Sequence, residues 1–149
     1  MPTEQTYRMS VRRRIPAPRD VVFEAWIDPQ GIREWMLPGD AISANAALDV
    51  RVGGSYRIVI RSKDQEHVHT GTYQVVDRPS KLVFTWTSRN DSPATLVTVE
   101  FLDRGQETEL IITHERFLQA ETTKRYEGGW GRIAERFATY LANPSSRAS

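Results

Sequence analysis

Cysteine is absent from this chain of 149 residues. Its absence excludes a disulfide framework, a thiolate nucleophile, an iron–sulfur cluster and a cysteine-ligated zinc site. An excess of one charge is absent too, because 20 Lys and Arg residues are balanced by 19 Asp and Glu residues. Nucleic-acid-binding proteins usually carry a clear basic excess or a concentrated basic stripe. Neither a nucleic acid nor an anionic membrane surface is therefore an expected partner.

Long hydrophobic runs are also missing. The first residues, MPTEQTYRMS, contain no apolar stretch of signal-peptide length, and no later segment approaches the ~18 uncharged apolar residues of a membrane span. The length fits one domain, since single cores usually run ~100–200 residues. The sequence predicts one cytoplasmic domain over residues 1–149, with flexible tails at 1–6 and 143–149.

The N-terminal segment has the alternation of a half-buried strand. Apolar and polar residues alternate between Tyr7 and Ile15. This alternation directs Arg12 and Arg14 outward, where an exposed strand face explains them. It directs Arg13 inward, where the guanidinium would need a carboxylate partner or a ligand anion.

Two short helices are predicted after this strand. Pro18 suits the first turn of a helix that continues through Trp26. Asp28-Pro29 then supplies an N-cap and a first helical position for a second helix, which carries Trp35.

Residues 46–115 have the pattern of a strand meander. Strand-like runs recur every ten to fifteen residues, with Gly, Asp or Pro between them. Gly53-Gly54 lacks the Lys-Ser/Thr ending of a phosphate loop, so a hairpin turn is expected there. Another turn is expected at Asn90-Asp91-Ser92-Pro93. With the first strand, about seven mostly antiparallel strands are predicted, the later ones at 48–52, 56–60, 69–76, 82–87, 96–102 and 108–115.

The last segment changes to a helical period. Tyr126, Trp130, Ile133, Phe137 and Leu141 recur at spacings of three and four, which predicts a long amphipathic helix over 126–141. Three glycines between positions 128 and 131 each cost about 1 kcal/mol of helix propensity relative to alanine. We therefore expect another element to approach the helix backbone closely at this point.

Alternation along the strands leaves one apolar face, on which His69, Tyr73 and Val75 are placed together. Threonine, arginine and glutamate side chains occupy the other face. A sheet with one buried face needs a covering layer, and the long helix with the two short ones supplies it. The predicted fold class is a two-layer α+β domain.

Short motifs follow one another in a specific order from about residue 7 to residue 141. They are Arg13–Ile15 with Ala17-Pro18, Val22-Phe23, Trp26, Trp35 after Asp28-Pro29, Val50–Tyr56, Gly71-Thr72-Tyr73, Leu82–Trp86, Thr98–Phe101, Thr108–Leu110, Thr113–Glu115 and Gly129-Trp130. This order resembles the START-like (SRPBCC) helix-grip superfamily, and more narrowly the activator of Hsp90 ATPase homologue 1-like family.

The resemblance implies a helix-grip fold of the START/Bet v 1-like type. In this fold a curved antiparallel sheet grips the C-terminal helix around a cavity that, in many relatives, receives an apolar small molecule. Relatives include lipid carriers, polyketide cyclases, antibiotic-sequestering proteins and a chaperone-stimulating domain. The resemblance therefore does not by itself define an activity.

Large rings on the converging faces are the candidate ligand contacts. The indole N–H groups of Trp35, Trp86 and Trp130 could orient the polar end of a ligand, or the rings could simply fill the space between helix and sheet. The predicted ligand-binding set is Trp35, Tyr56, His69, Tyr73, Phe84, Trp86, His114, Trp130 and Ile133.

Histidines are the candidates for acid–base chemistry or metal binding. His114 shares its strand face with apolar neighbours, so an inward imidazole could bind a ligand, act as acid or base, or be satisfied by a neighbour. His67 and His69 would face one side of a strand and could complete a three-histidine metal site with His114. A turn at Asp64 and Glu66 favours a solvated His67 instead, and no metal or other cofactor is predicted.

Catalytic residues are not evident, because the chain has no Gly-x-Ser-x-Gly elbow and no distinct carboxylate pair. We expect a small hydrophobic ligand to bind in an internal cavity between the C-terminal helix and the sheet. One alternative is a cyclase or isomerase that uses His114 or Tyr73. The other is a co-chaperone-like interaction domain, although the chaperone activators resembled here carry a further N-terminal domain for which this chain has no room. A homodimer is left open.

Overall fold

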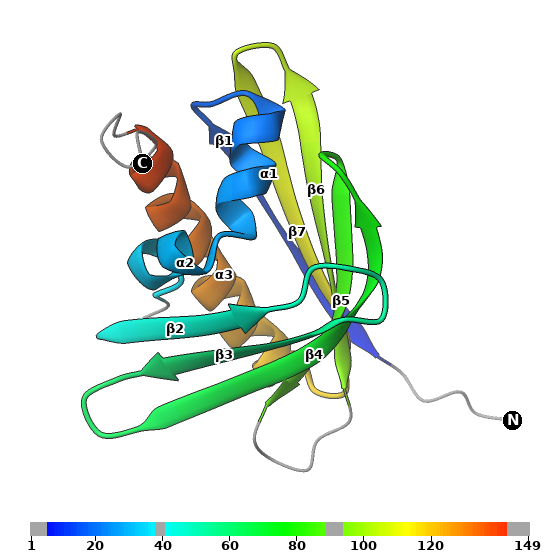
Figure 1. The fold of residues 1–149 in the computed structure, drawn as a ribbon. Coiled ribbons are helices and arrows are strands. Elements are labelled where there is room, and N and C mark those ends of the chain that lie inside the picture. Colours follow the sequence, from blue (N-terminus) through cyan, green and yellow to red (C-terminus); the bar gives the residue numbers. More distant parts are fainter. Residues whose placement is uncertain (1–5, 38–40, 89–93, 143–149) are drawn as a thin grey trace, which may run out of the picture.

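Within the described residues, 6–37, 41–88 and 94–142 of a computed structural model, seven strands form one antiparallel sheet and three helices cover one of its faces (Figure 1). The predicted helix-grip fold class is confirmed. Along the chain the elements are β1 (Tyr7–Ile15), α1 (Arg19–Trp26), α2 (Pro29–Trp35), β2 (Ser43–Leu48), β3 (Ser55–Arg61), β4 (Glu66–Asp77), β5 (Lys81–Ser88), β6 (Thr95–Arg104), β7 (Glu107–Phe117) and α3 (Ala120–Ala142).

The strands lie in the order β1-β7-β6-β5-β4-β3-β2. From β2 to β7, each strand pairs with the next one along the chain, as short turns favour. Strand β1 pairs with β7, so α1 and α2 carry the chain from one edge of the sheet to the other. The sheet curves around α3, which packs against β1, β7 and α2 (Figure 1).

The two short helices begin as their sequences predict. Pro18 precedes α1 in an extended conformation. Asp28 caps α2, because its side chain accepts a hydrogen bond of 3.1 Å from the backbone N–H of Gln30. Both helices bury an aromatic side chain at the end, Trp26 in α1 and Trp35 in α2.

Helix α3 begins six residues before the predicted start at Tyr126. Its first turns are polar, and the apolar stripe therefore does not reveal them. At this end the hydroxyl of Thr123 donates to the backbone carbonyl of Gln119. Further along, the buried side of α3 carries Trp130, Ile133, Phe137 and Leu141. No described helix combines the length and the apolar character needed to cross a membrane.

The predicted boundary of the second strand was wrong. The second strand ends at Leu48, and the chain then turns, with Gly53 at a φ of 87°. Gly53 and Gly54 exchange backbone hydrogen bonds with Tyr73 of β4. The segment 48–52 is therefore followed by a turn that pairs with the sheet, and it is not itself the predicted strand. The predicted turn at residues 90–93 and the predicted tails, apart from Thr6, lie outside the described residues.

Strand β4 contains an irregularity between Tyr73 and Val75. The extra residue reverses the alternation, as a bulge does. Val75 is consequently 37 % exposed instead of sharing the buried face with Tyr73, and Val76 packs against the core in its place.

Arg13 is exposed, and the prediction of an inward guanidinium was wrong. Strand β1 lies at the edge of the sheet, and its covered side is buried at Met9 and Ile15 but not at Arg13. Arg12 and Arg14 point outward as predicted and form ion pairs with Glu109 and Glu107 of β7.

Candidate functional site

Most of the aromatic side chains predicted to contact a ligand meet on the covered face of the sheet. The ring of Tyr56 lies 5.6 Å from that of Tyr73 and 5.4 Å from that of Phe84. Trp86 lies 5.4 Å from Trp130 of α3. All five side chains are at most 5 % exposed. These five residues, called the ring cluster below, connect β3, β4 and β5 to α3.

Trp35 joins the ring cluster indirectly, through Trp26. The rings of Trp35 and Trp26 are 4.8 Å apart, and Trp26 lies 6.3 Å from Trp130. Trp35 is fully buried, and its Nε1 atom has no hydrogen-bond partner. Ile133, the remaining apolar member of the predicted set, is buried on α3.

His114 is fully buried, and both of its ring nitrogens are engaged. Trp130 Nε1–H donates to His114 Nδ1 at 3.0 Å, which places the imidazole proton on Nε2. His114 Nε2 then donates to Thr95 Oγ1 at 2.6 Å, and the threonine hydroxyl donates to the backbone carbonyl of Trp86. Burial, and then repulsion from His69, lowers the pKa of His114 to about 3. His114 is therefore a neutral link between α3 and the sheet.

His69 differs from His114, although it faces the same interior. Its ring stacks on Trp86 at 4.5 Å, and its Nδ1 atom is buried without a hydrogen-bond partner. Burial, and then repulsion from His67, lowers the pKa of His69 to about 4. His67 is exposed on the same strand. Among the described residues, no group of three His, Asp or Glu side chains is arranged to hold a metal ion.

The position of Tyr56 depends on Gly71 in the neighbouring strand. The phenol of Tyr56 donates to the backbone carbonyl of Thr85. A Cβ atom at Gly71 would lie 1.9 Å from that carbonyl oxygen and 2.6 Å from the Tyr56 ring, so only glycine fits. Burial raises the pKa of Tyr56, and it raises that of Tyr73 to about 12. Both phenols are protonated at neutral pH.

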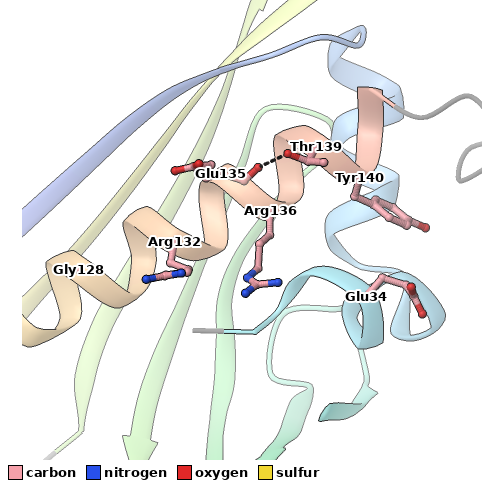
Figure 2. A pocket seen from close by; sticks show the side chains of 7 residues that line it. All are labelled: Glu34, Gly128, Arg132, Glu135, Arg136, Thr139 and Tyr140. Carbon is pink, nitrogen blue, oxygen red and sulfur yellow. Dashed lines mark hydrogen bonds between the residues drawn. The ribbon is translucent and has the colours of Figure 1, made fainter. Parts of the chain in front are cut away.

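A groove of about 880 Å³ lies along α3, beside α2 (Figure 2). None of the predicted ligand residues lines it. Its lining residues are Glu34, Gly128, Arg132, Glu135, Arg136, Thr139 and Tyr140. Figure 2 shows Arg132 and Arg136 extending from the same side of α3. The sequence analysis missed these arginines, although their spacing of four residues beside the apolar stripe is a signal for a shared helix face.

The glycines of α3 do not mark a close approach at Gly128 or Gly131. A Cβ atom at either position would meet nothing within 4 Å, so the expectation was wrong for both. Gly128 instead borders the groove, where the missing side chain leaves room.

A second pocket, of about 650 Å³, lies on the opposite face of the sheet over β2 to β5. Its lining is rich in hydroxyl groups, including those of Thr70, Thr72, Thr85 and Thr87. Of the predicted ligand residues, Tyr56 borders this pocket. The two pockets therefore lie on opposite sides of the sheet.

A curved sheet that grips a long C-terminal helix across a layer of rings is the architecture of helix-grip proteins. A model of the activator of Hsp90 ATPase homologue 1-like proteins matches residues 16–142, and the chain belongs to this family. No functionally curated protein matches the chain.

Several solved structures share the fold. Protein CV1439 from Chromobacterium violaceum is 20% identical, with a TM-score of 0.81, and the match covers 91% of this chain and 97% of that one. Mll3558 from Rhizobium loti is 26% identical, with a TM-score of 0.75 and coverage of 91% and 96%. DynU16, a protein of the dynemicin biosynthetic locus, is 21% identical, with a TM-score of 0.77, and the match covers 96% of this chain and 49% of DynU16.

Proposed function

We propose that this protein binds a small hydrophobic or aromatic molecule between α3 and the sheet, against the ring cluster. The observation that carries the proposal is His69, whose Nδ1 atom is buried beside Trp86 without a partner. Leaving such an atom unpaired costs about 1–3 kcal/mol. A ligand that forms a hydrogen bond with this atom would recover that free energy.

The hydrogen bonds around His114 support a binding role. Hydrogen bonds that run from Trp130 through His114 to Thr95 hold the rings of Trp130 and His114 at fixed positions. The Trp86 ring is held by its Nε1–H, which donates to the hydroxyl of Tyr126 at 3.2 Å. Fixed aromatic faces favour a ligand because little side-chain entropy is lost on binding. Burial of ~300 Å² of apolar surface at ~25 cal/mol per Å² gives a gross ~7 kcal/mol, so micromolar to millimolar dissociation constants are expected.

The origin of one structural neighbour supports testing a small-molecule role. DynU16 comes from the dynemicin biosynthetic locus, which makes a small-molecule ligand a natural class to test for this chain.

An enzyme acting in the same place is the second candidate, and His69 is its base. Both nitrogens of His114 are engaged, whereas Nδ1 of His69 has no hydrogen-bond partner among the described residues. Since burial lowers the pKa of His69 to about 4, the ring is neutral at neutral pH, and as a base it is weaker than a solvent-exposed histidine. A cyclase or isomerase would then lose turnover with His69→Phe while it still bound its substrate.

Titration with phenylnaphthylamine, a neutral aromatic dye whose emission rises in apolar surroundings, tests the binding proposal. We expect the wild-type protein to bind this dye with a micromolar to millimolar dissociation constant. His69→Ala removes ring surface from Trp86 and the unpaired Nδ1 atom, so it should weaken binding by about tenfold. His67→Ala, on the exposed part of the same strand, is the matched control and should bind like the wild type.

Two results would contradict the proposal. One is the absence of dye binding to the folded wild-type protein, which would favour a role in protein contacts. The other is an equal effect of the two histidine substitutions, which would place the dye away from the ring cluster.

A further inference from the structure

The groove beside α2 contains two arginines that form no ion pair with a carboxylate of the described residues. Arg132 and Arg136 are one helical turn apart on α3, and Figure 2 shows both guanidinium groups directed to the same side of the helix. None of the ion pairs formed within the described part of the chain includes either of them. Two like charges at this spacing destabilise a helix by about 0.2–0.5 kcal/mol.

Arg136 carries a further cost, because its Nε atom is buried and has no hydrogen-bond partner. The acidic residues of the groove do not relieve it. Figure 2 shows the Glu135 side chain on the other side of α3 and the Glu34 carboxylate turned away from Arg136. An anionic acceptor would satisfy this Nε–H group and also offset the two positive charges.

We propose that Arg132 and Arg136 bind the oxyanion group of a small aromatic acid. The inference goes beyond the proposed function, since the groove borders a different side of α3 from the ring cluster and would hold an acid rather than a neutral molecule. The groove volume of about 880 Å³ suits a small organic ligand. Gly128 keeps its N-terminal end open.

The chemistry favours arginine at this place. The planar guanidinium offers several N–H donors in a fixed fork, which matches the spacing of carboxylate or sulfonate oxygens. Arg132 and Arg136 lie far from the N-terminal end of α3, where the helix dipole is positive. The attraction for an anion therefore comes from the two side chains and depends on both.

Two dyes with the same ring system separate this inference from the proposed function. Anilinonaphthalene sulfonate carries an oxyanion, and phenylnaphthylamine is the same skeleton without it. We expect Arg136→Gln to weaken sulfonate binding by about tenfold and to leave phenylnaphthylamine within about twofold of the wild type. Arg132→Gln should act in the same direction. Arg125→Gln is the control, because Arg125 is exposed on α3 outside the groove and its loss removes the same charge.

The outcomes are distinct. If Arg136→Gln and Arg125→Gln affect sulfonate binding equally, or if Arg136→Gln weakens both dyes equally, the oxyanion site is overturned while dye binding stands. If neither dye binds the wild type, the proposed function fails, and benzoate decides the oxyanion site. The ¹⁵N NMR signal of Arg136 Nε–H, assigned by its loss in Arg136→Gln, should then shift with benzoate and not with benzamide. If the chemical shift of this signal does not change when benzoate is added, the proposal is overturned.

Discussion

The imidazole of His114 forms hydrogen bonds through both of its ring nitrogens to other residues of the protein. Its Nδ1 accepts from Trp130 and its Nε2 donates to Thr95, so no lone pair or proton is left for a ligand. His69, on β4, has the opposite character because its Nδ1 lacks a partner among the described residues. Of the two buried histidines, His69 rather than His114 is therefore the candidate for contacting a ligand.

Gly71 makes a second residue-scale prediction. Replacing it with alanine would bring a Cβ atom to 1.9 Å from the carbonyl oxygen of Thr85 and to 2.6 Å from the Tyr56 ring. Strand β4 or the Tyr56 ring must then move, and the hydrogen bond from Tyr56 to Thr85 is lost. We expect Gly71→Ala to lower the free energy of unfolding by about 3 kcal/mol, measured by urea denaturation. A loss below about 1 kcal/mol would show that the strands separate easily here.

At the scale of the element, α3 has two different sides. One side carries the buried stripe of Trp130, Ile133 and Phe137, which attaches the helix to the core. The side that borders the groove carries Arg132 and Arg136. The glycines lie near the start of both surfaces, where they lower helix propensity.

Gly131→Ala should stabilise α3. An added Cβ atom at this position meets nothing within 4 Å, so the substitution restores helix propensity without a clash. We expect the free energy of unfolding to rise by about 0.5–1 kcal/mol. Thermal or urea denaturation of Gly131→Ala and Gly71→Ala, measured side by side, should show a higher free energy of unfolding for the first variant and a lower one for the second. A Gly131→Ala protein less stable than the wild type would show that a neighbouring side chain contacts this turn of the helix.

For the whole molecule, the two buried histidines predict a loss of stability in acid. The pKa values of His69 and His114 in the folded protein are about 4 and about 3, below the usual 6.5. Between pH 6.5 and 4 the unfolded chain therefore binds more protons than the folded one, and stability falls as the pH falls. The expected slope is on the order of 1 kcal/mol per pH unit for each histidine.

Urea denaturation followed by tryptophan fluorescence at several pH values from 7 to 4 measures this slope. His69→Phe keeps a ring on Trp86 but cannot titrate, so it should reduce the slope by about half. His67→Phe, at the exposed position, should leave it unchanged. Glu109, whose pKa is held low by Arg104 and then Arg12, acts in the same direction only below about pH 4.5. An unchanged slope in His69→Phe would mean that this imidazole is readily protonated in the folded protein.

Much of the fold could be predicted because its signals are local. Alternation located β1, the Asp28-Pro29 cap located α2, and the stripe from Trp130 to Leu141 located the buried side of α3. The bulge in β4 could not be predicted, because the residue that faces inward depends on the register with β5. The side chain of Arg13 was predicted to be buried, because alternation does not show which positions of an edge strand are left uncovered by the helices.

The family, the succession of strands and helices along the chain and the set of rings that face inward could be predicted from the sequence alone, since each depends on the spacing of residues along the chain. Which buried polar atoms find hydrogen-bond partners could be seen only in the folded protein. The partners of His114 come from β6 and α3, whereas Nδ1 of His69 has none. The arginine groove likewise exists only because α2 folds beside α3. Hydrogen bonds and pockets depend on contacts between distant segments, and spacing along the chain does not encode them.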